Sequence, residues 1–446
     1  MKELSVAQSQ KMPENIGPHI VIIGGGFGGL ACAQQLGRSN ARVTLIDRRN
    51  HNLFQPLLYQ VATAALSPAD IAEPIRKSLA RYANVSMVMA EVTGVDTEAH
   101  DVQLKDGKVI EYDRLVIATG SEYNYFGHDE WQLYAPGLKT IHEAREIRQR
   151  LLLAFEQAEI TDDPDLKRSL LTFVVIGGGP TGVEMAGAIS ELGRFMISRD
   201  FRHLHSDDLR VVLVEAGQRL LATFPDHLAI YARNYLLKIG VEIRTSTRVE
   251  DIKHDSVRFG DELIRTSCTV WGAGVKASPA AQWLSIEAVA GGRIEVDKHL
   301  QVRGLDDVYA IGDTAFCKGA DGKPLPGLAQ VAKQQGVYLG RTLRDRFPLN
   351  GPGFIFHNRG NTAVIGRHAA IFDFGRWTLK GRIAWLLWAF VHVYLLINFE
   401  KRILVTVQWI WRYLTRQRGA RIIDESFLDR SNAEAEPYIH QTRQTI

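Results

Sequence analysis

Three glycines near the start of the chain, Gly24, Gly26 and Gly29, have the spacing that binding of a dinucleotide requires. The first permits a tight turn, the second lets the backbone approach a pyrophosphate, and the third permits close packing of a helix against a strand. Asp47 follows about 20 residues later, where a carboxylate can accept hydrogen bonds from a ribose. These residues predict a dinucleotide-binding unit in which a helix N-terminus faces the phosphates.

The same pattern returns in the middle of the chain. Gly177, Gly179 and Gly182 follow an apolar run, and Glu215 ends the next one. Two copies of one pattern indicate an internal repeat and therefore two different dinucleotides. An acid at the position of Glu215 repels the 2′-phosphate of NADPH and favours NADH, although Arg219 lies close enough in sequence to weaken this preference.

Strands and helices must position these residues. Apolar runs that predict buried strands of parallel sheets lie at residues 19–23, 41–46, 114–120, 171–176, 209–214, 268–274 and 308–313. Helices are expected at residues 71–82 and 140–159, and short alternating strands between residues 85 and 111. The fold class is therefore α/β.

Other polar groups follow these strands. Thr119-Gly120 and Ala273-Gly274 end two of them in small residues, which suit a backbone that passes close to a bound nucleotide. Asp313 could hydrogen-bond a flavin's ribityl chain or phosphates, or it could cap the next helix. The helix that follows contains three glutamines, Gln330, Gln334 and Gln335. They could offer neutral donors and acceptors to the ring of a ligand, or they could form a solvated face of the helix.

Length and composition narrow the class of protein. A chain of 446 residues suggests two or three domains, and a net charge of +3 gives no field that favours nucleic acid. The three cysteines, Cys32, Cys268 and Cys317, lie far apart and have no metal-ligand spacing, so we expect free thiols and no metal site. Residues 1–17 are polar and do not resemble a signal peptide.

Together these motifs resemble the flavoproteins with two dinucleotide-binding domains and, more narrowly, the type II NADH:quinone oxidoreductases. The narrower resemblance rests on residues 54–62, 177–184, 271–274 and 329–336, and it covers residues 18–420. It implies that the first unit holds FAD and that the second holds NADH. Hydride would pass from NADH to the flavin and electrons would then reduce a membrane quinone, without proton pumping.

The resemblance also implies which residues form the sites. The FAD contacts would be Gly24, Gly26, Phe27, Gly28, Gly29, Asp47, Arg48, Gln55, Tyr59, Thr119, Gly120, Asp313, Ala329 and Gln330. The NADH contacts would be Gly177, Gly179, Pro180, Thr181, Gly182, Glu184, Glu215, Ala273 and Gly274. The residues implied to act in catalysis are Glu184, Gln330, Lys333 and Gln334. Glu184 would orient the nicotinamide or handle protons, or it is simply an acid stabilised by the dipole in a first helical turn.

The composition changes after Gly375. Five of the eight tryptophans follow, and residues 383–399 are apolar except for His392 and Asn398, over a length that is marginal for crossing a bilayer. Next comes an apolar stripe at helical spacing, Leu404, Val407, Trp411 and Leu414, with arginines at 412, 416, 418 and 421. These features favour attachment to one membrane leaflet, with a true span and a dimer interface as alternatives. We expect His392 to be packed, and Lys380 to be an interfacial anchor or a pocket residue.

The sequence thus predicts two Rossmann-like domains, the second inserted in the first, and a membrane-binding helical region. The predicted FAD domain comprises residues 18–125 and 295–345, the NAD domain residues 126–294, and the C-terminal region residues 346–424, with flexible ends at 1–17 and 425–446. The enzyme would lie on the cytoplasmic face of the plasma membrane. Alternatives are a soluble NADH-dependent reductase of a small iron–sulfur protein and a nucleotide-sensing flavoprotein resembling apoptosis-inducing factor.

Overall fold

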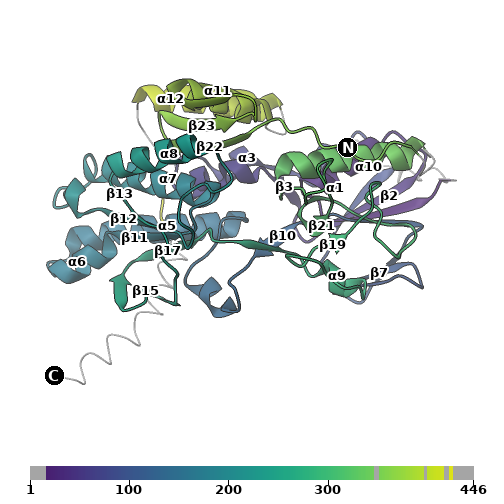
Figure 1. Cartoon of the computed structure of the whole chain (residues 1–446), viewed down its shortest axis with the longest axis horizontal. Coiled ribbons are helices and arrows are strands. Elements are labelled where there is room, and N and C mark those ends of the chain that lie inside the picture. The colour runs from purple at the N-terminus through teal and green to yellow at the C-terminus, as the bar shows by residue number, and fades with distance from the viewer. Residues whose placement is uncertain (1–16, 346–350, 396–398, 416–420, 425–446) are drawn as a thin grey trace, which may run out of the picture. The chain divides into compact units, whose positions relative to one another are not determined.

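The computed structural model describes residues 17–345, 351–395, 399–415 and 421–424, and all statements below refer to these residues (Figure 1). They form two compact units, each assembled from separate stretches of the chain. The first unit contains residues up to 53, 72–122 and 275–358, and the second contains residues 54–71, 123–274 and 359 onwards. The predicted flexible ends, residues 1–17 and 425–446, lie outside the described residues except for Gly17.

The first unit is built on a five-stranded parallel sheet with the order β20-β9-β1-β2-β5. Its strands are β1 (His19–Ile23), β2 (Arg42–Asp47), β5 (Val85–Met89), β9 (Arg114–Ile117) and β20 (Val308–Ala310). Ile20, Val21 and Ile22 of the central strand are fully buried, as expected for a strand covered on both faces. The helices of this unit are α1 (Phe27–Leu36), α4 (Ile75–Leu79), α9 (Ala280–Trp283) and α10 (Ala329–Asp345).

Helices α1 and α10 approach each other backbone to backbone because glycines line their contact. A Cβ atom on Gly336 would lie 2.1 Å from the carbonyl oxygen of Gly28, and one on Gly340 would lie 2.8 Å from that of Cys32. No other residue type fits at this distance. The helix that carries the glutamines is therefore fixed against the helix that follows the first glycine-rich turn.

Short strands complete the first unit. β6 (Val92–Asp96), β7 (Asp101–Leu104) and β8 (Val109–Glu111) form an antiparallel sheet. The helix expected at residues 71–82 is wrong in its first half, because β3 (His51–Leu53) pairs with β4 (Ala72–Pro74) before the short α4 begins. Pro74 explains the error, since the residue before a proline avoids the helical conformation. The remaining strands are β10 (Ser121–Tyr123), β18 (Val275–Ala277), β19 (Ile294–Glu295) and β21 (Ala315–Phe316).

The second unit repeats the parallel plan with the strand order β13-β12-β11-β17. These strands are β11 (Thr172–Ile176), β12 (Arg210–Val214), β13 (Val241–Arg244) and β17 (Cys268–Trp271). The helices are α5 (Ile141–Ile160), α6 (Pro164–Leu170), α7 (Pro180–Ile197) and α8 (Asp226–Lys238). An antiparallel ribbon lies between β13 and β17 in the chain: β14 (Asp251–Lys253), β15 (Ser256–Phe259) and β16 (Glu262–Arg265).

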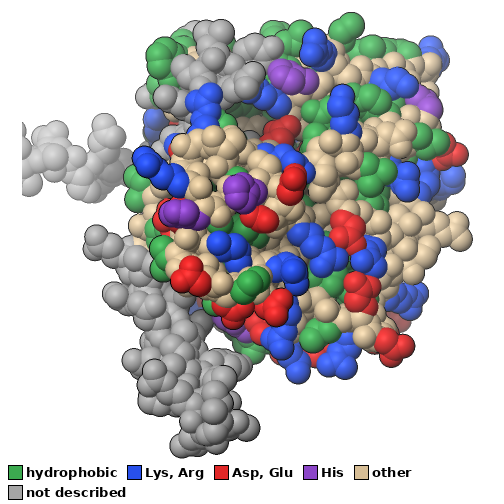
Figure 2. All heavy atoms as spheres, turned by 90° about the vertical axis from the view of Figure 1, so that its left-hand side faces the viewer, with side chains coloured by type: hydrophobic (Ala, Val, Ile, Leu, Met, Phe, Trp, Pro, Cys, Tyr) green, Lys and Arg blue, Asp and Glu red, His purple; other side chains and the backbone are tan. Residues whose placement is uncertain are grey.

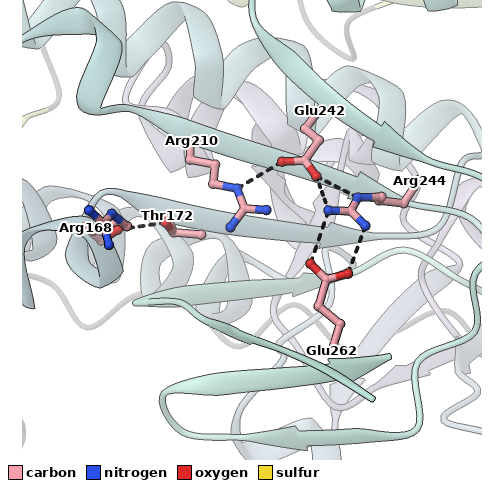
Figure 3. Close-up of polar contacts among 6 residues, drawn as sticks. All are labelled: Arg168, Thr172, Arg210, Glu242, Arg244 and Glu262. Atoms are coloured by element: carbon pink, nitrogen blue, oxygen red, sulfur yellow. Dashed lines mark hydrogen bonds and ion pairs between the residues drawn. The ribbon is translucent and has the colours of Figure 1, made fainter. Parts of the chain in front are cut away.

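A network of charges ties this ribbon to the sheet (Figure 3). Glu242 accepts hydrogen bonds from Arg210 Nε at 2.9 Å and Arg244 Nε at 2.6 Å, and the Arg244 guanidinium binds Glu262 at 2.9 Å. These side chains are partly exposed, so each pair contributes little alone. Figure 2 likewise shows Lys, Arg, Asp and Glu side chains intermixed over one face of the molecule, in keeping with the small net charge.

Two further stretches belong to the second unit. Residues 54–71 carry α2 (Leu58–Ala62) and α3 (Pro68–Ile71), and α2 packs against α5 and α7. The C-terminal stretch forms the antiparallel strands β22 (Asn361–Gly366), β23 (Ala369–Asp373) and β24 (Thr378–Gly381), followed by α11 (Arg382–Leu395) and α12 (Phe399–Thr415). Figure 1 shows both helices beside β22 and β23. The predicted boundaries differ here, since they assign residues 54–71 to the first domain and make the C-terminal region separate.

All three cysteines are buried and free. Burial raises the pKa of the Cys32 and Cys268 thiols to about 12 and also raises the pKa of Cys317.

Candidate functional site

The first glycine-rich turn follows β1, and its three glycines have different surroundings. Gly24 has a φ of +105°, and a Cβ there would lie 2.3 Å from the carbonyl oxygen of Ala118. A Cβ on Gly29 would lie 1.9 Å from the carbonyl oxygen of Gly24. A Cβ on Gly26, in contrast, would meet no atom within 4 Å, so the turn leaves open space at its middle glycine. This is the cradle that a pyrophosphate needs.

The second turn, after β11, has the same geometry. Gly177 has a φ of +109°, and its Cβ would lie 2.5 Å from the Gly272 carbonyl group. A Cβ on Gly182 would lie 1.8 Å from the Gly177 carbonyl oxygen, while one on Gly179 would meet no atom within 4 Å. The internal repeat is therefore present in three dimensions, and both units offer a cradle that fits a dinucleotide.

The acids that end the second strands also brace these turns. Asp47 accepts hydrogen bonds from the backbone N–H of Gly25 at 2.6 Å and of Arg49 at 2.7 Å. Glu215 accepts corresponding bonds from Gly178 and Gly217, each at 2.5 Å. A carboxylate has about four acceptor positions, so each acid retains capacity for a ribose hydroxyl. Sequence reasoning assigned the ribose contact and missed the bracing role.

Arg219, which weakened the preference for NADH, has other partners. Its guanidinium donates to the carbonyl oxygens of Phe224 at 3.1 Å and Ala222 at 2.8 Å. It also forms an ion pair with Asp226 at 2.8 Å. The positive charge of Arg219 is therefore held by partners within the chain.

In the first unit, polar groups gather where β9 and β20 end. Asp313 accepts a hydrogen bond from Ser121 Oγ at 2.6 Å, and the Thr119 and Ser278 hydroxyl oxygens are 2.5 Å apart. Gly312 donates its backbone N–H to Gln335 Oε1 at 2.7 Å. The structure thus brings Thr119, Gly120 and Asp313 to the same sheet edge as the first cradle. It adds Ser121 and Ser278, which no motif had indicated.

The glutamines of α10 have different environments. Gln334 Nε2 donates to the carbonyl oxygen of His357 at 2.9 Å, and His357 N–H donates back to Gln334 Oε1 at 3.0 Å. Gln335 is buried against Gly312, whereas Ala329 and Gln330 are partly exposed and Lys333 is exposed. The three implied catalytic residues on this helix therefore differ in their surroundings. The Gln334 amide binds the backbone of His357, whereas Gln330 is partly exposed and Lys333 is exposed.

Five other predicted FAD contacts have different surroundings. Phe27 is partly buried, Arg48 is exposed, and Gly28 lies against α10. Gln55 and Tyr59 belong to the second unit, where Gln55 Nε2 donates to the Lys139 carbonyl oxygen at 3.4 Å and the Tyr59 hydroxyl accepts from Gln60 at 3.0 Å. Their sequence position suggested the first unit because their contacts with α5 and α7 could not be foreseen.

Glu184 lies in the first turns of α7, after Pro180 and Thr181. Burial raises the pKa of its carboxyl group to about 8, although the residue as a whole is partly exposed. Its Oε1 atom accepts a hydrogen bond from the backbone N–H of Val364 at 3.1 Å. The carboxyl group therefore links the helix of the second cradle to strand β22.

Two more residues of α7 lie against the C-terminal stretch. Glu191 Oε1 accepts the Arg367 N–H at 2.6 Å, two turns beyond Glu184. Between them, a Cβ on Gly187 would lie only 2.0 Å from the Ile365 carbonyl oxygen. The C-terminal strands are thus fixed directly to the helix that begins at the second glycine-rich turn.

The C-terminal helices present a large apolar surface. Ile383 and Phe390 of α11 are 69% and 68% exposed, and Val407 of α12 is 58% exposed. Other large side chains that are half or more exposed on these helices are Leu386, Tyr394, Ile403, Leu404, Ile410 and Trp411. Monomeric soluble proteins rarely expose a contiguous patch of this kind. Within the described residues, no helix combines the length and apolar character that a transmembrane span needs.

Other predictions for this region had mixed outcomes. His392 is buried as expected, stacks on Trp388 at 4.4 Å and hydrogen-bonds its carbonyl oxygen, and burial lowers its pKa to about 4. Lys380 is exposed over the ring of Tyr231. Arg421 forms an ion pair with Asp200. The side chains of Arg412, Leu414, Arg416, Arg418 and Asn398 lie outside the described residues.

Two parallel-stranded units, each with a glycine-rich turn braced by the acid that follows its second strand, are the architecture of flavoprotein-type oxidoreductases with two dinucleotide-binding domains. In agreement, residues 18–336 match the family described as "Pyridine nucleotide-disulphide oxidoreductase". Residues 358–418 match the "NDH2 C-terminal domain". The chain belongs to the type II NADH:quinone oxidoreductases.

Individual relatives agree with this family. The chain is 37% identical to the type II NADH:quinone oxidoreductase Ndh of Mycobacterium tuberculosis, over 93% of this chain and 92% of the relative. It is 31% identical to the mitochondrial internal alternative NAD(P)H-ubiquinone oxidoreductase A1 of Arabidopsis thaliana, over 91% and 86%. A solved structure of Plasmodium falciparum NDH2 has the same fold, with a TM-score of 0.82 at 22% identity, over 92% of this chain and all of that one.

Family membership gives the activity. The protein is an enzyme that oxidises NADH, uses FAD and reduces a quinone. This activity is favoured over the two alternatives from the sequence, a reductase of an iron–sulfur protein and a nucleotide-sensing flavoprotein.

Proposed function

We propose that the first unit holds FAD and that the second unit holds NADH. The observation that carries this proposal is the pair of matching cradles, each open at its middle glycine and braced by its own acid. The first cradle shares its sheet edge with Thr119, Asp313 and α10, which offer polar groups along a longer ligand. The second has Glu215, with Arg219 bound elsewhere, which suits NADH.

In this arrangement the protein binds and orients its ligands. Bound FAD would supply the redox chemistry between NADH and quinone. In the first unit, N–H groups of the Gly24–Gly29 turn would bind the flavin's pyrophosphate, and Asp47 its ribose. Gly177–Gly182 and Glu215 would do the same for NADH. Gln330 and Lys333 would face the flavin, while Gln334 holds the nearby backbone.

Glu184 is proposed to hold a proton on its carboxyl group near neutral pH. Its raised pKa and its hydrogen bond to Val364 support this role. A group with a pKa near the working pH is suited to taking up and releasing protons, and quinone reduction consumes protons.

The C-terminal helices are proposed to attach the enzyme to one leaflet of the membrane, where quinone dissolves. The exposed apolar side chains of α11 and α12 support this placement. We further propose that the enzyme is peripheral on the cytoplasmic face of the plasma membrane. A homodimer that covers the same apolar surface is the alternative.

Chromophore release tests the cofactor assignment. The purified protein should be yellow, and denaturation should release FAD, because no covalent link is proposed. A second arm adds vesicles that contain quinone to NADH and enzyme, and rapid NADH oxidation should require the quinone. A colourless protein that FAD does not reconstitute would contradict the proposal.

A further inference from the structure

The loop after β10 is fastened to the end of β17 in the second unit. Asn124 N–H donates to the Gly274 carbonyl oxygen at 3.2 Å, and Trp271 Nε1 donates to the Asn124 carbonyl oxygen at 3.2 Å. The Asn124 side chain in turn accepts the N–H of Phe126 at 2.9 Å. One asparagine therefore fixes Phe126 beside residues 271–274.

Both the backbone conformation and the exposure of Phe126 are unfavourable for a phenylalanine. Its φ of +54° is in the left-handed region, which costs free energy for any residue other than glycine. Its side chain is 62% exposed, whereas the neighbouring rings of Tyr125, Trp131 and Trp271 are buried. The ring contacts Trp271 with 6.3 Å between the ring centroids, but packing within the chain leaves most of its surface uncovered.

The strand order shows which part of a dinucleotide this ring would meet. Glu215 follows β12 on one side of β11, and Gly274 follows β17 on the other side. A dinucleotide lies across the carboxyl ends of such strands with its pyrophosphate at the central glycine turn. With the adenosine ribose at Glu215, the nicotinamide half extends toward Gly274. A Cβ on Gly274 would lie 3.0 Å from Phe126 Cζ, so the ring covers this glycine.

We propose that Phe126 binds the nicotinamide half of NADH, with its exposed ring packing against the nicotinamide riboside. This inference rests on the proposed placement of NADH in the second unit. The strained backbone and exposed ring are then features of the binding site, since backbone strain of this kind clusters at ligand sites.

The test compares NADH with ADP-ribose, which has the adenosine and pyrophosphate but no nicotinamide. Phe126→Ala should raise the KM for NADH about two- to tenfold, the range expected for loss of one aromatic contact. The inhibition constant of ADP-ribose and the quinone KM should stay within about twofold of wild type, and Phe126→Tyr should retain the wild-type KM for NADH. Leu133→Ala, an exposed apolar residue of the same segment, is the control and should change none of these constants.

A glycine variant separates binding from folding. Phe126→Gly relieves the left-handed conformation, so its melting temperature should equal or exceed that of Phe126→Ala while its KM for NADH rises equally. An unchanged NADH KM in both variants, or equal weakening of ADP-ribose, would overturn the role of Phe126. If ADP-ribose does not compete with NADH in the wild-type enzyme, or if Glu215→Ala does not weaken it, the placement of NADH fails and the inference fails with it.

Discussion

Glu184 illustrates how one residue can connect two parts of the second unit. Its helix begins at the second glycine-rich turn, while its carboxyl group binds the backbone of β22 in the C-terminal stretch. Burial disfavours the charged form, so the proton is held to a pH well above the ordinary value for a glutamate.

The raised pKa predicts how stability depends on pH. Because the folded-state value of about 8 lies above the ordinary 4.5, the folded protein retains a proton that the unfolded chain releases. The contribution of Glu184 is therefore full below about pH 4.5 and is lost as the pH rises through about 8. Glu184→Gln should make the melting temperature fall less steeply across this interval. Parallel curves for wild type and variant would contradict the buried carboxyl.

The same substitution tests the proposed proton role. We expect the kcat of the wild-type enzyme to show an inflection near pH 8 that Glu184→Gln lacks, with FAD content unchanged. Glu191→Gln is the matched control, because Glu191 lies on the same helix and also accepts a backbone N–H from the C-terminal stretch. If the control loses the inflection too, the effect belongs to the packing of α7 on β22.

Asp47 and Glu215 provide a paired prediction for the two sites. Glu215→Ala should raise the KM for NADH about tenfold, because a charge-assisted hydrogen bond is lost. The FAD content and the KM for quinone should stay unchanged. Asp47→Ala should do the reverse, lowering FAD content and leaving the NADH KM of the remaining holoenzyme unchanged. Each variant is the control for the other in absorbance and steady-state measurements. If Glu215→Ala lowered the FAD content and Asp47→Ala raised the KM for NADH, the two assignments would have to be exchanged.

At the scale of single residues, spacing predicted the glycines well. The structure shows a tight turn at Gly24 and a close backbone approach at Gly29, while the pyrophosphate contact assigned to Gly26 stays a prediction. Gly187 and Gly336 had no such signal, because the atoms that exclude a Cβ at these positions belong to segments far away in the sequence.

Helix α10 depends on close approach to α1. Gly336→Ala would place a methyl group 2.1 Å from the Gly28 carbonyl oxygen, so we expect a loss of about 1–3 kcal/mol in stability and a lower FAD content. Arg341→Ala, on the exposed side of the same helix, is the control. Thermal unfolding and the ratio of flavin to protein absorbance measure both effects. Equal melting temperatures would show that the two helices can separate without cost.

Among elements, the long parallel strands were predictable and several connections were not. Apolar runs such as residues 19–23 and 171–176 are strands because both sheet faces are covered. Residues 71–82 carry enough helix-forming side chains to suggest one helix, yet Pro74 and pairing with β3 place a strand first. The strand forms because it pairs with a segment about 20 residues away, and the local sequence pattern carries no information about that pairing.

For the whole molecule, the arrangement of α11 and α12 predicts attachment by adsorption. Their exposed apolar side chains would enter the interface, so Phe390→Glu and Val407→Glu should each release the enzyme from anionic vesicles in a pelleting assay. Ile230→Glu, a residue of α8 that is also more than half exposed, is the control and should remain bound. High salt should weaken binding of the wild type. Retention of all three variants would contradict the proposed surface.

The interleaving of the chain was the least predictable feature at this scale. The repeat indicated two dinucleotide units, but residues 54–71 join the second unit although they lie within the first in sequence. Their contacts with α5 and α7, and those of α3 with α12, form only in the folded chain.

The burial of the three thiols has a chemical consequence for an enzyme that reduces quinones. Quinones are electrophiles, and a thiolate adds to them in a Michael reaction that ends in permanent alkylation. The thiolate is the reactive form, and burial with raised pKa values suppresses it at Cys32, Cys268 and Cys317. These side chains therefore resist covalent poisoning by the very compound that the enzyme must meet at every turnover.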